Sequence, residues 1–121
     1  MRRSGSEARD TRSPRLSEEL EERLRPSRYL GYDRDHLGVA LLRREMFEAA
    51  LSQFRRAVYL NPYEAAFKQH LAWCLYRMES YADALAAIDE ALRQKPGDPD
   101  AAVVRERILA GEEKRGAQSR S

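Results

Sequence analysis

The chain has 121 residues, of which 35% are charged and 42% are hydrophobic, a balance that fits one soluble domain with a modest core and flexible ends. Its formal net charge is only +2, so no overall field commits it to nucleic acid or to an anionic membrane. Cys74 is the only cysteine, which excludes an internal disulfide and favours a reducing compartment. The amino-terminal stretch has paired arginines without the apolar run of a secretory signal, so we expect a cytoplasmic protein with no membrane span.

Residues 1–28 are predicted to form a flexible basic arm that is rich in Arg and Ser and has little to bury. Within the arm, SEELEERLRP (17–26) begins with Ser17, a suitable N-cap, and ends at a proline. Leu20 and Leu24 of this stretch, together with Leu16 just before it, form a stripe at four-residue spacing. We expect a short helix over 17–25. Because a helix of about eight residues is marginal in water, it needs a surface, and the exposed first hairpin of the domain or a partner would supply one.

Residues 29–111 are predicted to form an all-α domain, because apolar residues recur at helical spacing and no stretch alternates with a period of two. The apolar residues that mark the first four helices lie within 37–41, 47–58, 71–78 and 81–92. A fifth helix is predicted over 99–111, with Asp98 as its N-cap and Pro99 in its first position. The tail, 112–121, is predicted to be disordered.

Two stretches share one apolar skeleton, ALSQFRRAVYLNP (50–62) and ALAAIDEALRQKP (84–96). Aligning 31–64 with 65–98 gives an offset of 34 residues without a gap. The matched pairs include Leu37 with Leu71, Leu41 with Leu75, Phe47 with Tyr81, Ala50 with Ala84, Ala57 with Ala91 and Pro62 with Pro96. Each unit is therefore predicted to be a helical hairpin whose apolar face is covered only when the next hairpin stacks on it.

These matched residues and their 34-residue period resemble the tetratricopeptide repeats. The resemblance implies an α-solenoid of two hairpins, 31–64 and 65–98, followed by a capping helix over 99–111. Glu45 and Glu79 stand where the family often has glycine, in the turn between the two helices of a hairpin. If that turn needs a left-handed residue, each glutamate costs roughly 1 kcal/mol.

In the family, the first helix of each hairpin lines a concave groove that holds an extended peptide or a helix. The resemblance places these residues in the groove: Tyr32, Asp35, Val39, Leu42, Arg43, Gln69, His70, Trp73, Tyr76, Arg77, Asp100, Val103 and Arg107. We expect Trp73 to dominate binding, because tryptophan, tyrosine and arginine carry most of the energy at interface centres. The alternative is that Trp73 packs against the next hairpin and contributes only to stability.

The partner is expected to be a peptide or helix with apolar anchors and acidic flanks, because the groove has an aromatic middle and arginines at its edge. A clamp for the carboxylate of chaperone tails is not expected. In the family that clamp uses lysine, asparagine and arginine, and the corresponding positions here are Asp35, Val39, His70, Asp100 and Val104.

No enzyme, cofactor or metal is expected. His70 precedes Cys74 by four residues, a spacing that metal ligands use, but two histidines and one cysteine give no strong fourth ligand. No glycine-rich phosphate loop or nucleophile elbow is present. Binding of nucleic acid by the basic arm is not favoured, because Glu7 and Asp10 interrupt it and no aromatic residue is interleaved.

The sequence therefore predicts a non-enzymatic adaptor or scaffold that binds a partner protein through the groove. Two alternatives stay open. The chain could be a structural or assembly subunit of a larger complex, with its groove filled by residues 16–24, or it could be a dedicated chaperone for one client.

Overall fold

The computed structural model describes residues 30–120, and the arm over 1–28, with the helix expected over 17–25, lies outside these residues. The described part contains five helices: α2 (Tyr32–Arg43), α3 (Phe47–Leu60), α4 (Ala65–Arg77), α5 (Tyr81–Gln94) and α6 (Pro99–Arg120). It contains no strand, and the predicted all-α class is confirmed. None of these helices combines the length and apolar character that a membrane crossing requires.

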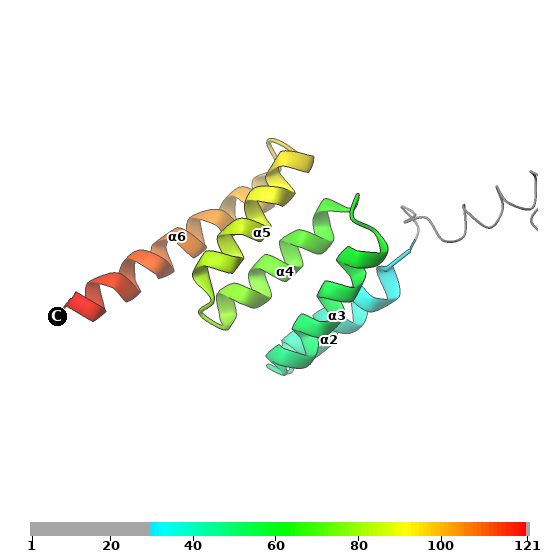
Figure 1. The fold of residues 1–121 in the computed structure, drawn as a ribbon, viewed down its shortest axis with the longest axis horizontal. Coiled ribbons are helices and arrows are strands. Elements are labelled where there is room, and N and C mark those ends of the chain that lie inside the picture. The colour runs from blue at the N-terminus through cyan, green and yellow to red at the C-terminus, as the bar shows by residue number, and fades with distance from the viewer. Residues whose placement is uncertain (1–29, 121) are drawn as a thin grey trace, which may run out of the picture.

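The helices form two hairpins followed by a single helix (Figure 1). The hairpins are α2 with α3 and α4 with α5, and α6 packs against both α4 and α5. Since α2 also contacts α4, the first helices of successive units form one continuous layer, against which α3 and α5 pack. This layer carries the residues that the sequence places in the groove.

The two hairpin turns share one left-handed backbone geometry. Glu45 and Glu79 have φ angles of 59° and 62°. In the first turn, the amide of Met46 donates to the carbonyl of Leu41 at 3.0 Å, and Ser80 donates to Leu75 at 2.9 Å in the second. This is the arrangement in which a left-handed residue, usually glycine, closes a helix. Each glutamate therefore stands where a side chain is strained.

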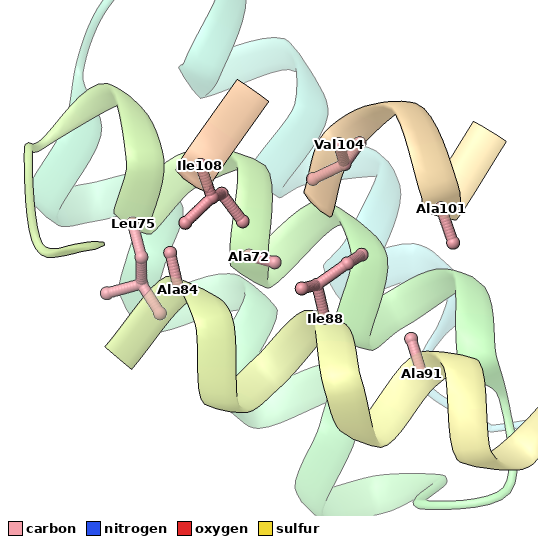
Figure 2. Close-up of a cluster of buried hydrophobic side chains, with 8 residues drawn as sticks. All are labelled: Ala72, Leu75, Ala84, Ile88, Ala91, Ala101, Val104 and Ile108. Carbon is pink, nitrogen blue, oxygen red and sulfur yellow. The ribbon is translucent and has the colours of Figure 1, made fainter. Parts of the chain in front are cut away.

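The larger core cluster joins the second hairpin to α6 (Figure 2). Its buried members are Ala72, Leu75, Ala84, Ile88, Ala91, Ala101, Val104 and Ile108. Alanines allow the helix axes to approach, while Ile88 and Ile108 fill the space between them and are fully buried. Burying a side chain of this size contributes about 1.5–3 kcal/mol. A second cluster of Ala50, Phe54 and Cys74 joins the first hairpin to α4.

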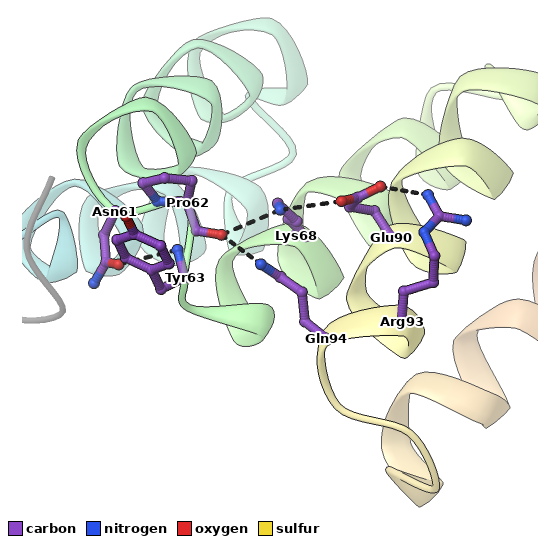
Figure 3. A network of polar contacts seen from close by, with 7 residues as sticks. All are labelled: Asn61, Pro62, Tyr63, Lys68, Glu90, Arg93 and Gln94. Atoms are coloured by element: carbon purple, nitrogen blue, oxygen red, sulfur yellow. Dashed lines mark hydrogen bonds and ion pairs between the residues drawn. The ribbon is translucent and has the colours of Figure 1, made fainter.

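The loop after α3 is held by polar contacts from the second hairpin (Figure 3). The carbonyl oxygen of Pro62 accepts hydrogen bonds from Lys68 Nζ at 3.2 Å and from Gln94 Nε2 at 2.6 Å. Lys68 also pairs with Glu90 at 3.8 Å, and Glu90 in turn contacts Arg93. Proline cannot continue the hydrogen-bond ladder of α3, and its carbonyl then anchors the next unit.

The last helix is longer than the sequence predicts. Its start has the expected geometry, since the Asp98 side chain accepts a hydrogen bond from the amide of Asp100 at 3.1 Å. Its end does not, because α6 continues through the tail expected to be disordered, from residue 112 to Arg120. Gly111, the last residue of the predicted helix, lies against Tyr81, where an added Cβ would come within 2.7 Å of the ring.

Candidate partner-binding groove

A hollow of about 320 Å³ lies between α4 and α6, and we call it the Trp73 hollow. It is lined by Gln69, His70 and Trp73 of α4 and by Asp100, Val103 and Val104 of α6. In each helix the lining residues are separated by one, three or four positions, so they share one helix face. Five residues that the resemblance places in the groove by their repeat position are thus brought together: Gln69, His70, Trp73, Asp100 and Val103.

Trp73 is half-buried and is held on two sides. Its ring lies 4.9 Å from the ring of Tyr76, and the guanidinium of Arg107 lies over it at 5.9 Å. It also packs against the larger core cluster while lining the hollow. The two alternatives for Trp73 are therefore not exclusive: packing fixes its ring, and a fixed ring loses little conformational entropy on binding.

A buried carboxylate lies beside the hollow. Asp35 is only 4% exposed, and its Oδ1 lies 2.7 Å from Nδ1 of His70. A buried carboxylate requires a hydrogen-bond partner, and this contact joins α2 to α4. The His70 ring also lies near the Phe54 ring, with 5.8 Å between the ring centroids. His70 therefore holds a fixed position in the wall of the hollow.

Three expected residues on α2 lie away from the Trp73 hollow. Val39 and Leu42 are half-buried and pack against the cluster formed by Ala50, Phe54 and Cys74. Arg43 is exposed in the last turn of α2. The layer is thus continuous, and the Trp73 hollow lies in its α4–α6 part, away from these three residues.

The other expected residues lie near the edge of the hollow. Arg107 covers Trp73, whereas Arg77 lies over the ring of Phe47 at 5.1 Å and reaches Glu45 at 3.9 Å. The Tyr76 ring lies against Trp73 in a tilted arrangement, and Tyr76 also helps to line a separate hollow of about 300 Å³ beside Gly111. Along α6, Asp100 lies about one turn before Val103 and Val104 and Arg107 about one turn after them, so a carboxylate and a cation flank the apolar centre along this helix.

A larger hollow, of about 550 Å³, lies on the first hairpin. Its lining is polar and basic: Arg34, Ser52, Gln53, Arg55, Arg56 and Tyr59. Volume alone does not make a peptide site, because affinity comes from apolar anchors that are removed from water. We therefore assign more weight to the Trp73 hollow than to this basic depression.

The chemistry of Cys74 is that of a structural residue. It is fully buried, its Sγ contacts the carbonyl oxygen of Phe47 at 3.4 Å, and burial raises the pKa of its thiol. A thiol kept protonated is a poor nucleophile and a poor metal ligand. Within residues 30–118, no three of the His, Cys, Asp and Glu side chains are grouped so that they could hold a metal.

One feature of the site was not found from the sequence: Asp35 is buried against His70 rather than open to a ligand. Val104, one of the positions that correspond to the carboxylate clamp of the family, lines the hollow, and it stands 34 residues after His70. Repeat-related positions share a place in the layer, so the sequence places both residues there. No comparable signal predicts the pair of Asp35 and His70, since it joins residues at different positions of the repeat.

A family model described as Tetratricopeptide repeat matches residues 41–108, which is more than half of the chain. The match includes α3, α4, α5 and most of the buried part of α6. Among curated proteins, no significant match was found.

Proposed function

The chain belongs to the tetratricopeptide repeat family, and from this premise we propose that it is a non-enzymatic adaptor that binds a partner peptide or helix in the groove formed by α4 and α6. Repeats of this family generally mediate protein–protein interaction, and the family is typically non-enzymatic. The adaptor role, the groove and the cytoplasm as the place of action are our proposals.

The Trp73 hollow is the single observation that carries the proposal. It offers an apolar centre of Trp73, Val103 and Val104 with a half-exposed valine at its rim, since Val103 is 52% exposed. An exposed apolar hollow with a few polar groups around it is the usual form of a binding site. One apolar side chain of the partner would enter it and leave water.

The charges around the hollow set the chemistry of the flanks. Arg107, above Trp73, suits an acidic residue next to the apolar anchor. Asp100, about one turn before Val103 in the same helix, suits a backbone amide or a basic residue on the other flank. The partner would therefore be an apolar anchor with an acidic residue toward Arg107, rather than a uniformly acidic segment.

The proposal is tested by closing the hollow without disturbing the core. Val103→Glu places a carboxylate at the exposed rim, and it should weaken partner binding about 30-fold, which corresponds to about 2 kcal/mol. Trp73→Ala, which also removes a ring packed against the larger core cluster, should weaken binding at least as much. The partner is captured from native cells with the intact chain, and affinities of the variants are then measured with that partner.

Leu109→Glu is the matched control, because Leu109 lies in the same helix, is 37% exposed and does not line the hollow. It should bind like the parent, and circular dichroism should show equal helical content in all variants. Equal affinity of the Val103→Glu chain and the parent would refute binding in the groove.

The same capture separates the two alternative functions. If the chain is recovered with a whole assembly, and this recovery is lost on deletion of residues 1–28, the result would favour an assembly subunit. Binding only to unfolded client would favour the chaperone.

A further inference from the structure

The first hairpin presents a face of α2 that has no neighbour among the described residues. In the second unit, the same face of α4 rests on α3, where Cys74 is buried and Leu71 is half-buried. The residues 34 positions earlier are Ala40 and Leu37. Both are exposed, and Leu37 is 44% exposed. We call this the outer face of α2. An apolar surface of this kind indicates a missing packing partner.

The segment just before α2 has the register of the missing helix. Shifted by 34 residues, Leu16, Leu20 and Leu24 coincide with Ala50, Phe54 and Val58 of α3. Ala50 and Phe54 are fully buried in the contact of α3 with α4. The three leucines thus stand where α3 has its packing residues.

The polar residues of this segment also fit that register. Glu18, Glu21 and Glu22 coincide with Ser52, Arg55 and Arg56, which are exposed on α3. Leucines on the covered side and glutamates on the open side are the pattern of an amphipathic helix.

The prolines and the linker agree with the same placement. Pro14 falls in what would be the first turn, where proline is tolerated, and Pro26 falls at the position of the last residue of α3. A helix over 14–25 would then be followed by a short connection to Tyr32, comparable with the connections that join α3 to α4 and α5 to α6.

We propose that residues 14–25 form a helix that packs on the outer face of α2 and completes a half-unit in front of the first hairpin. The occupant is this segment of the same chain, which is tethered at the amino-terminal end of α2. Leu20 would lie over His36 and Leu37, as Phe54 lies against His70 in the next unit.

A compensated pair of charges supports this placement. In the last unit, Ala91 of α5 and Ala101 of α6 are both buried at the same end of the core cluster (Figure 2). The residues 68 positions earlier are Arg23 and Asp33. An arginine at a position that elsewhere requires alanine would be costly by itself. If Arg23 faces Asp33, the two opposite charges form a pair. This pair explains both the arginine at the position of Ala91 and the aspartate at the position of Ala101.

The first test locates the segment by a disulfide. Leu16→Cys and Ala40→Cys are combined in the full chain with Cys74→Ala, since Ala50 and Cys74, their equivalents, share one buried cluster. Mild oxidation should convert most of the protein to an intramolecular disulfide, detected by mass and by faster gel migration. The comparison chain carries Leu16→Cys and Gln69→Cys, which would join only if the segment filled the Trp73 hollow. Absence of the first disulfide, or a faster second one, overturns the proposal.

The second test exchanges the charges. Arg23→Asp and Asp33→Arg should each lower the Tm by about 4 °C, and the chain with both changes should recover most of that loss. Arg25→Asp is the control, because Arg25 coincides with Tyr59, which is 72% exposed on α3. Combined with Asp33→Arg, it should give no recovery. Additive losses for Arg23 and Asp33 would overturn the proposed register.

Discussion

Glu45 and Glu79 occupy the same place in the two hairpins and share a backbone conformation that disfavours any side chain. The left-handed region brings Cβ too close to the neighbouring carbonyl oxygen, at a cost of about 1–2 kcal/mol, which glycine avoids. Glu45 gains one ion pair that partly offsets this strain, because its carboxylate lies 3.9 Å from the guanidinium of Arg77 at an exposed site. Exposed pairs of this kind contribute little.

We therefore predict that Glu45→Gly and Glu79→Gly each stabilise the protein. Each should raise the free energy of unfolding by about 0.5–1 kcal/mol, less than the full strain because glycine also loses more backbone entropy on folding. Urea unfolding of the single and double variants measures this, and the two gains should add because the turns lie in different hairpins. Ala86→Gly, at an exposed helical position of α5, should instead lose about 1 kcal/mol. A loss at either glutamate would contradict the strain argument.

Single residues of the site differ in whether the sequence alone predicts their place. Trp73 and Val103 are found from the repeat register alone, because the register fixes the helix face on which a residue lies. The contact between Asp35 and His70 is not, because it depends on the distance between two helices in different units. Side-chain pairs across a layer are set by tertiary packing, which the linear pattern does not encode.

The two hairpins use different pairs of residues at the same contact between their first and second helices. Where the first helix crosses the second, the first unit uses Gly38 with Phe54 and the second uses Ala72 with Ile88. A Cβ added at Gly38 would come within 2.6 Å of the Phe54 ring, which is fully buried and has no space to move away. The smaller residue on one helix therefore accompanies the bulkier one on the other.

This pairing predicts a coupled pair of substitutions. Gly38→Ala should lower the free energy of unfolding by about 1–2 kcal/mol, because overpacking outweighs the gain in helix propensity. Phe54→Ile alone should cost about 1–2 kcal/mol for the cavity it leaves. The chain with both changes reproduces the pair of the second unit and should lose clearly less than the sum. Denaturant unfolding of the four chains gives the coupling energy, and strict additivity would refute direct contact as the cause.

The end of α6 shows why element boundaries are harder to predict than elements. A glycine just after the last apolar residue of a helical pattern is a usual signature of a helix end, and Gly111 fits it. Glycine is also used where two elements approach closely, and here it meets Tyr81. Arg115 then donates from Nη1 to the carbonyl oxygen of Glu79 at 2.7 Å, which holds the following turn of α6 to the second hairpin. The sequence alone does not distinguish the two uses of glycine.

At the scale of the molecule, two hairpins are few for a solenoid, because each unit depends on its neighbours for cover. The 34-residue spacing is enough to predict the hairpins, since the same residues must recur wherever units touch. The helices that cover the two ends of the stack follow the repeat pattern less closely, because each of them contacts a hairpin on one side only. The carboxyl-terminal cover is α6, which presents Ala101, Val104 and Ile108 to the core.

Removing this cover should unfold much of the molecule. A chain that ends at residue 98 lacks α6, so Ile88 and Ala91 lose the side chains that bury them. Three buried apolar residues are lost with the helix. At about 1–3 kcal/mol each, their loss is large against a total stability of about 5–15 kcal/mol. We predict a chain without a cooperative thermal transition that binds a hydrophobic dye.

A chain that ends at residue 111 distinguishes the contribution of the buried part of α6 from that of the rest of the helix. It keeps Ala101, Val104 and Ile108 but loses the hydrogen bond from Arg115 to Glu79. One such bond contributes about 0.5–1.5 kcal/mol, so the shortened chain should unfold cooperatively with a Tm lower by about 4–8 °C. If the chain ending at 98 melted as sharply as this one, the second hairpin would be stable without α6. The fold would then not depend on a neighbouring helix that covers the apolar face of each hairpin.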